Sequence, residues 1–115
     1  TSKLYNLDYL RSVSGDNEEF IREMVLTFTQ TIPPILEEMK TALHNEDWKQ
    51  LARMAHQIKP SFTLMGLTSM RGNIVFIEEN SKNGTRLEEL PWTVLDFIRT
   101  CQALLPELAN EALPA

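Results

Sequence analysis

The sequence predicts an all-α fold: an antiparallel up-down four-helix bundle with a short N-terminal helix or arm. Apolar residues recur at steps of three and four along four separate stretches, which is the period of an amphipathic helix. No stretch alternates apolar and polar residues with the β-branched enrichment of a strand. Because the connections between the four stretches are short, consecutive helices are expected to run antiparallel.

Length and composition predict one globular domain over residues 1–115. The 43% apolar and 23% charged content is typical of a folded protein. A formal charge of −5 argues against nucleic-acid binding, which usually needs a basic face. No apolar run approaches the roughly 18 residues of a membrane span, and no signal peptide opens the chain, so no membrane contact is expected. Cys101 is the single cysteine, which indicates a reducing, cytoplasmic setting without a disulfide.

The first half of the chain is predicted to hold a short helix or arm over residues 4–10, then a turn and a long helix over 17–44. Asp16 or Asn17 can cap the long helix. Pro33 either bends that helix or divides it into two, because proline lacks an N–H and crowds the preceding turn. Its apolar positions are Phe20, Ile21, Met24, Val25, Phe28, Ile35, Leu36, Met39, Ala42 and Leu43.

The second half adds a helix from residue 67 that ends in a loop at 80–84, where Asn83-Gly84 is a typical stop. A final helix starts near Pro91, bends at Pro106 and frays over 111–115. Its predicted buried side consists of Val94, Leu95, Ile98, Cys101, Leu105 and Leu108.

Between these halves lies the most informative stretch, a helix over 47–66 with Asp47 as N-cap and Gly66 as C-terminal stop. Its apolar stripe consists of Trp48, Leu51, Ala55, Ile58, Phe62 and Met65. At about 100° per residue, His56 points roughly 130° away from the centre of that stripe, towards solvent or a partner. On the same wheel His56 is flanked by Lys49, Ala52, Arg53, Lys59, Pro60 and Thr63.

This surface is the one candidate for chemistry. The chain has no glycine-rich phosphate loop, no Cys-x-x-Cys, no His-Glu-x-x-His and no Gly-x-Ser-x-Gly. His44 and His56 fall on different predicted helices, so neither a metal site nor a cofactor is expected. An exposed neutral imidazole offers a nucleophilic lone pair, and Lys59 one turn away can donate to an anionic group on it. The alternative is an ordinary solvated helix face.

The order His56-Gln57-Ile58-Lys59-Pro60-Ser61, followed by Gly66, resembles the histidine-containing phosphotransfer (HPt) domain. The family motif runs His-x-x-Lys-Gly-Ser/Ala with a second glycine ten residues after the histidine. The resemblance implies a phosphocarrier rather than an enzyme, in which His56 takes a phosphoryl group from one receiver domain and passes it to another. It also implies that Lys59 offsets the phosphoryl charge, and that Ser61 either helps to position the group or supports the helix.

The implied partners are response-regulator receiver domains and a sensor or hybrid histidine kinase, with the receiver supplying the catalytic aspartate and Mg²⁺. Gln57, Pro60, Ser61 and Gly66 are then supporting residues, and Lys49, Ala52, Arg53 and Thr63 contact the partner. A monomer is expected. It would be either a stand-alone protein or an excised domain, such as the C-terminal part of a membrane-bound hybrid kinase.

Pro60 departs from the motif, which has glycine at this place. Its ring crowds the His56 carbonyl and it has no N–H to donate, so a local bend or a lost hydrogen bond at the His56 turn is predicted. A competing interpretation is a bundle that docks partners without phosphorylation, through apolar residues such as Phe20 and Ile35. A hydrolytic or redox enzyme fits less well, because no nucleophile–base pair is recognisable.

Overall fold

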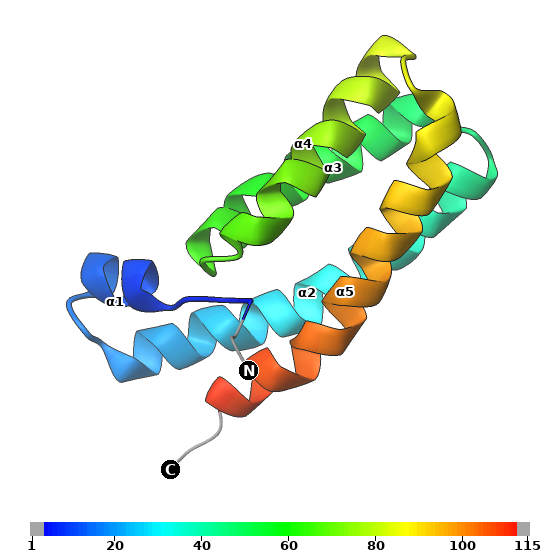
Figure 1. Ribbon diagram of the computed structural model, residues 1–115. Coiled ribbons are helices and arrows are strands. Elements are labelled where there is room, and N and C mark those ends of the chain that lie inside the picture. The colour runs from blue at the N-terminus through cyan, green and yellow to red at the C-terminus, as the bar shows by residue number, and fades with distance from the viewer. Residues whose placement is uncertain (1–3, 113–115) are drawn as a thin grey trace.

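A computed structural model describes residues 4–112 of the chain, and this part is entirely helical, as predicted (Figure 1). Beside five α-helices it contains one 3-10 turn, η1. The bounds are α1 (Asp8–Ser14), α2 (Glu18–His44), α3 (Trp48–Leu64), α4 (Thr68–Asn83), η1 (Leu87–Glu89) and α5 (Leu90–Glu111). None of these helices is both long and apolar enough to cross a membrane.

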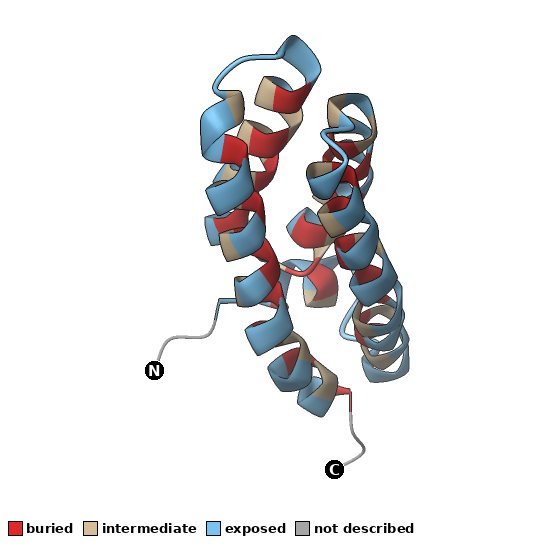
Figure 2. Cartoon of the chain, turned by 90° about the vertical axis from the view of Figure 1, so that its right-hand side faces the viewer, coloured by how far each residue is buried: buried red, intermediate tan, exposed pale blue. Residues whose placement is uncertain are grey.

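Helices α2 to α5 form the bundle, and α1 packs against α2. Within the bundle α3 contacts α2 and α4, and α5 contacts α2 and α4, so each helix has two neighbours. Consecutive helices run in opposite directions (Figure 1), and their buried residues face the interior of the bundle (Figure 2). The predicted up-down arrangement is therefore confirmed.

Side-chain caps fix where α2 and α3 begin. Asn17 accepts a hydrogen bond from the backbone N–H of Phe20 at 3.0 Å, which decides between the two predicted caps of α2. Asp47 accepts from the backbone N–H of Gln50 at 3.2 Å, as predicted for α3. These bonds satisfy N–H groups that the first turn of a helix leaves unpaired.

The two prolines of α2 do not divide it. Helix α2 is a single helix from Glu18 to His44 with Pro33 and Pro34 inside it, which selects the first of the two predicted alternatives. In Figure 1 its first and second halves run in visibly different directions. Both prolines are exposed, so the carbonyls that lose a helical donor lie where water can bind them.

The predicted loop at residues 80–84 was wrong, because α4 continues to Asn83. The predicted stop at Asn83-Gly84 is confirmed, since Gly84 is the left-handed C-cap with a φ of 67°. The polar side chains of this stretch bond back to their own helix. The amide of Asn80 donates to the Phe76 carbonyl at 2.8 Å, and the hydroxyl of the buried Ser81 donates to the Ile77 carbonyl. These side-chain hydrogen bonds to the helix backbone allow α4 to continue through polar residues whose composition predicts a loop.

The core centres on three phenylalanines from three helices. The Phe62 ring lies 5.2 Å from Phe28 and 5.4 Å from Phe97, measured between centroids, and joins α3 to α2 and α5. Cys101 is buried as predicted, and burial raises the pKa of its thiol to about 12. Leu95 was wrongly placed in the core, since it is 45% exposed while Leu104 is buried.

The N-terminal segment combines both predicted forms, an extended arm followed by a short helix. Tyr5, Leu7 and Leu10 are buried, and the Asn6 N–H donates to the Met65 carbonyl at 3.3 Å. The Tyr5 hydroxyl donates to Glu111 at 2.7 Å, so the arm reaches the end of α5. Glu111 is still helical; of the predicted frayed tail, residues 113–115 lie outside the described part of the chain.

Candidate functional site

His56 stands on the solvent side of α3, with its side chain 71% exposed. The helix fixes this orientation because the opposite side, with Leu51, Ala55, Ile58 and Phe62, is fully buried against the bundle. The direction predicted from the helical wheel is confirmed.

A carboxylate from the neighbouring helix holds His56. Glu78 of α4 accepts from Nδ1 of His56 at 2.7 Å through Oε2 and from Nζ of Lys59 at 2.8 Å through Oε1. The Glu78 side chain is only 17% exposed, because Ile74 and Ile77 anchor this side of α4 in the core. The hydrogen bond from Lys59, together with that from His56, lowers the pKa of Glu78 and outweighs the opposing effect of burial.

The contact with Glu78 determines which imidazole nitrogen is available. An ionised carboxylate can only accept, so Nδ1 of His56 must carry the hydrogen. In the neutral ring Nε2 then bears the free lone pair. The exposed nitrogen is thus the nucleophilic one.

Next to His56, α3 and α4 enclose a shallow cationic hollow of about 630 Å³. Of the predicted partner-contact residues, Lys49, Ala52 and Arg53 line it together with His56. Helix α4 contributes Glu78, Ser81 and Lys82, none of which the sequence analysis had selected. With three cationic side chains around its rim, this hollow favours an anionic group at His56.

On the other side of His56, α2 and α3 form a smaller apolar groove of about 130 Å³. Gln57 and Ser61 line this groove rather than the cationic hollow. Their neighbours there include Met24, Phe28, Ile32, Ile35 and Leu64. His56 therefore occupies a ridge between an anion-attracting surface and an apolar one.

Three further predicted residues lie outside both hollows. Pro60 is exposed, and α3 continues through it to Leu64 although residue 60 has no N–H for the His56 carbonyl. Thr63 is exposed and donates its hydroxyl to the Lys59 carbonyl at 3.2 Å. Gly66 has a φ of 68°, and a Cβ there would lie 2.7 Å from the carbonyl carbon of Asn6, so it accommodates the N-terminal arm.

Glu78 is the site residue that sequence reasoning missed. The available signal was its place directly after Ile77 on an amphipathic helix, which put it at the edge of the buried side. The side chains that Glu78 contacts depend on the relative axial position of α3 and α4, which helical periodicity does not predict. Within residues 4–112, no three metal-ligating side chains of the His, Cys, Asp and Glu types come together.

The fold and this surface define a helical-bundle domain with one histidine-centred site. The family model for the Hpt domain matches residues 23–111, which is most of the chain and includes all of α3. The chain therefore belongs to the Hpt domain family. Members are phosphotransfer intermediates of two-component phosphorelays, act as phosphocarriers rather than catalysts, and interact with receiver domains and kinases. No curated protein and no solved structure matched the chain.

Proposed function

We propose that His56 is the phosphoryl-accepting residue of this Hpt domain, receiving the group from a receiver-domain aspartate and returning it to the aspartate of another receiver. The observation that carries this proposal is the bond between Nδ1 of His56 and Glu78, which leaves Nε2 exposed with its lone pair free. The other histidine within residues 4–112, His44, has no such carboxylate partner.

In the proposed step the Nε2 lone pair attacks phosphorus, a P–N bond forms, and the P–O bond to the receiver aspartate breaks with the electron pair leaving on the carboxylate. Nδ1 keeps its hydrogen, so the imidazole ring becomes positively charged. Glu78 faces that charge at 2.7 Å and stabilises it, as a buried carboxylate does for a catalytic imidazolium. Transfer onwards reverses these bond changes on the second receiver.

Lys59 supplies the positive charge beside the incoming group. Its ammonium has three donors, and only one is needed for Glu78 at 2.8 Å. The remaining donors can bind phosphoryl oxygens without releasing Glu78. Lys49, Arg53 and Lys82 add a positive field around the same position.

The receiver is proposed to dock across α2 and α3, covering His56 and the apolar groove that Gln57 and Ser61 line. Ser61 then serves the docking surface, and Thr63 the Lys59 turn. The receiver brings the aspartate and Mg²⁺, so the bundle needs no cofactor of its own. We further propose that residues 1–115 act as one monomeric domain in the cytoplasm, where such kinases and receivers work.

The test is transfer of labelled phosphate from a phosphorylated receiver domain to the full chain. We expect an acid-labile, base-stable label on the wild type and on His44→Gln, and none on His56→Gln. Because both histidines are exposed, His44→Gln is a matched control. A His56→Gln variant that still accepts the label would overturn the proposal. If neither the wild type nor any variant is labelled, but His56→Gln still binds receiver domains, the bundle is a docking module instead.

A further inference from the structure

A second concave surface lies between α4 and α5, away from His56. This α4–α5 groove holds about 530 Å³ and is lined by Gly72, Asn73, Phe76, Glu88, Glu89, Trp92, Thr93 and Asp96. At 100° per residue, its α4 residues point roughly 170° away from Glu78 around the helix axis. A molecule bound there would leave the His56 surface open.

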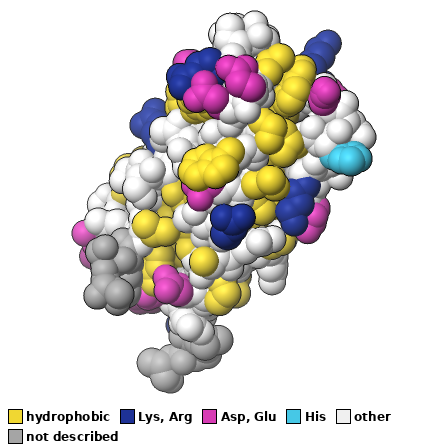
Figure 3. Space-filling view, turned by 45° about the vertical axis from the view of Figure 1, so that its right-hand side comes forward, with side chains coloured by type: hydrophobic (Ala, Val, Ile, Leu, Met, Phe, Trp, Pro, Cys, Tyr) yellow, Lys and Arg dark blue, Asp and Glu magenta, His cyan; other side chains and the backbone are white. Residues whose placement is uncertain are grey.

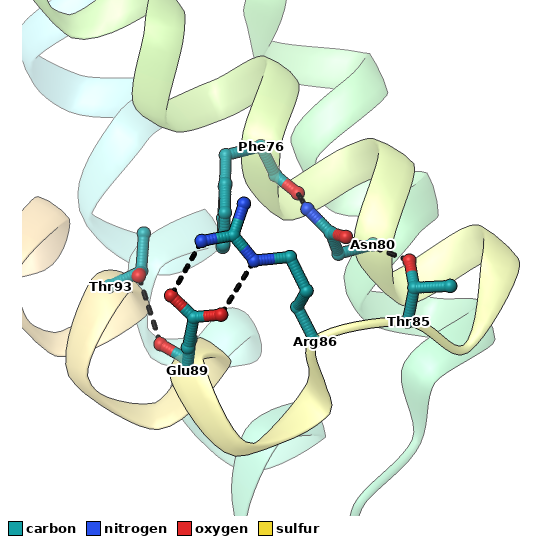
Figure 4. Close-up of polar contacts among 6 residues, drawn as sticks. All are labelled: Phe76, Asn80, Thr85, Arg86, Glu89 and Thr93. Carbon is teal, nitrogen blue, oxygen red and sulfur yellow. Dashed lines mark hydrogen bonds and ion pairs between the residues drawn. The ribbon is translucent and has the colours of Figure 1, made fainter.

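A network of polar contacts fixes one end of the groove (Figure 4). Arg86 lies over the Phe76 ring, 4.8 Å from its centroid, and donates to both carboxylate oxygens of Glu89 at 2.5 and 2.7 Å. Thr93 donates to the Glu89 carbonyl at 2.9 Å. The groove wall is thus preformed, and the Arg86 charge is already paired within it.

The remaining lining is acidic and aromatic. Trp92 is 73% exposed, the most exposed large hydrophobic side chain within residues 4–112. Glu88 and Asp96 flank it. Neither forms a salt bridge among the described residues, but the charge of Glu88 also acts on Arg86, whose main partner is Glu89. Figure 3 shows acidic and hydrophobic side chains next to one another on the face where α5 comes forward, with basic side chains close by. An exposed indole beside two carboxylates that form no salt bridge within residues 4–112 suits a cation, which can bind over the ring and to the carboxylates together.

Gly72 is a glycine that the fold does not require. It lies inside α4, its φ is not positive, and a Cβ built on it meets nothing within 4 Å. Glycine in a helix interior lowers the stability of the helix relative to alanine, so Gly72 does not stabilise the bundle. Its missing side chain leaves space in the groove near Trp92.

We propose that the α4–α5 groove binds a basic, amphipathic segment of a partner protein. A lysine or arginine of that segment lies over Trp92 between Glu88 and Asp96, and an apolar side chain fills the space at Gly72. This inference is independent of the proposed role of His56, because the two surfaces lie on opposite sides of α4.

The experiment uses the full chain with Trp48→Phe, which leaves Trp92 as the single tryptophan. The probe is a synthetic amphipathic peptide of lysine and leucine, compared with one in which glutamate replaces lysine. We expect saturable blue-shifting of the Trp92 emission by the basic peptide only. Glu88→Gln/Asp96→Asn should weaken the affinity at least tenfold, and Gly72→Leu should abolish binding.

The matched control is Glu23→Gln/Glu38→Gln, which removes the same charge from exposed positions on α2. It should leave the affinity unchanged. If both double variants weaken the peptide affinity equally, the binding is due to net charge alone and the proposed site is wrong. Equal binding of the acidic peptide, or peptide binding that does not saturate, would also overturn the proposal. Sedimentation showing that Trp92→Ala dissolves a dimer would assign the groove to a second copy instead. Labelling of His56 in each variant reports separately on the phosphotransfer proposal.

Discussion

Replacing Glu78 by alanine tests the arrangement of the site more sharply than any change at the motif residues. The substitution removes the acceptor of two hydrogen bonds, from His56 at 2.7 Å and from Lys59 at 2.8 Å. His56 and Lys59 themselves remain. Any loss of transfer then arises from the tautomer and orientation of the imidazole and from the freed ammonium.

The size of the effect follows from the bond to Nδ1. A hydrogen bond to a charged group contributes about 1.5–3 kcal/mol, and the exposure of His56 favours the lower end. About 1.4 kcal/mol corresponds to a tenfold change in an equilibrium or a rate. Glu78→Ala should therefore slow phosphoryl transfer about tenfold. Glu78→Gln should slow it less, because its amide oxygen still accepts from Nδ1–H.

The assay is single-turnover transfer from a phosphorylated receiver, with Glu79→Ala as control, since Glu79 is the exposed neighbour on the same helix. Repeating Glu78→Ala in a Lys59→Ala background separates the two contacts: a slowing that persists there acts through His56. A Glu78→Ala rate within twofold of wild type would refute the reasoning, and so would equal slowing by Glu79→Ala.

Four other outcomes are expected. Because the pKa of Glu78 lies below its ordinary value of 4.5, its contacts should stabilise the fold above pH 4.5 and lose this effect as the pH falls through the lowered pKa. In thermal melts at a series of pH values, Glu78→Gln should lack this pH-dependent part of the stability. Gly66→Ala should lower the free energy of unfolding more than Gly15→Ala, because both glycines have positive φ but only a side chain at position 66 would meet the Asn6 backbone. Gly15→Ala alone should lower it by about 1–2 kcal/mol. Equal losses of the two variants in urea denaturation would contradict the packing argument. Pro60→Ala should raise the thermal midpoint by restoring a donor to the His56 carbonyl, and an unchanged or lower midpoint would show that α3 accommodates proline without cost. Cys101 should react with a thiol reagent at pH 8 only after unfolding, since burial raises its pKa to about 12; rapid reaction of the folded chain would contradict this.

The helices and the outward direction of His56 followed from the sequence because both depend on local periodicity. The caps Asn17 and Asp47 and the buried Cys101 followed for the same reason. Leu95 shows the limit of this reasoning. A helical wheel identifies an apolar side only when most apolar residues share it, and Leu95 lies off the arc that α2 and α4 cover.

What the sequence could not supply were contacts between elements. The partnership of Glu78 with His56 and Lys59 depends on the relative position of α3 and α4. The role of Gly66 depends on an arm sixty residues earlier in the chain, which packs against it. The family motif marked Gly66 as a supporting residue; in the structure its missing side chain leaves room for the Asn6 backbone.

The central claim is that the phosphoryl group is carried on Nε2 of His56. Nuclear magnetic resonance of the phosphorylated chain labelled with ¹⁵N in histidine tests it directly, because coupling to ³¹P identifies the bonded ring nitrogen. We predict coupling to Nε2 of His56, with Nδ1 keeping its hydrogen and its bond to Glu78. Phosphate on Nδ1, on His44, or on no histidine of the chain would contradict the account.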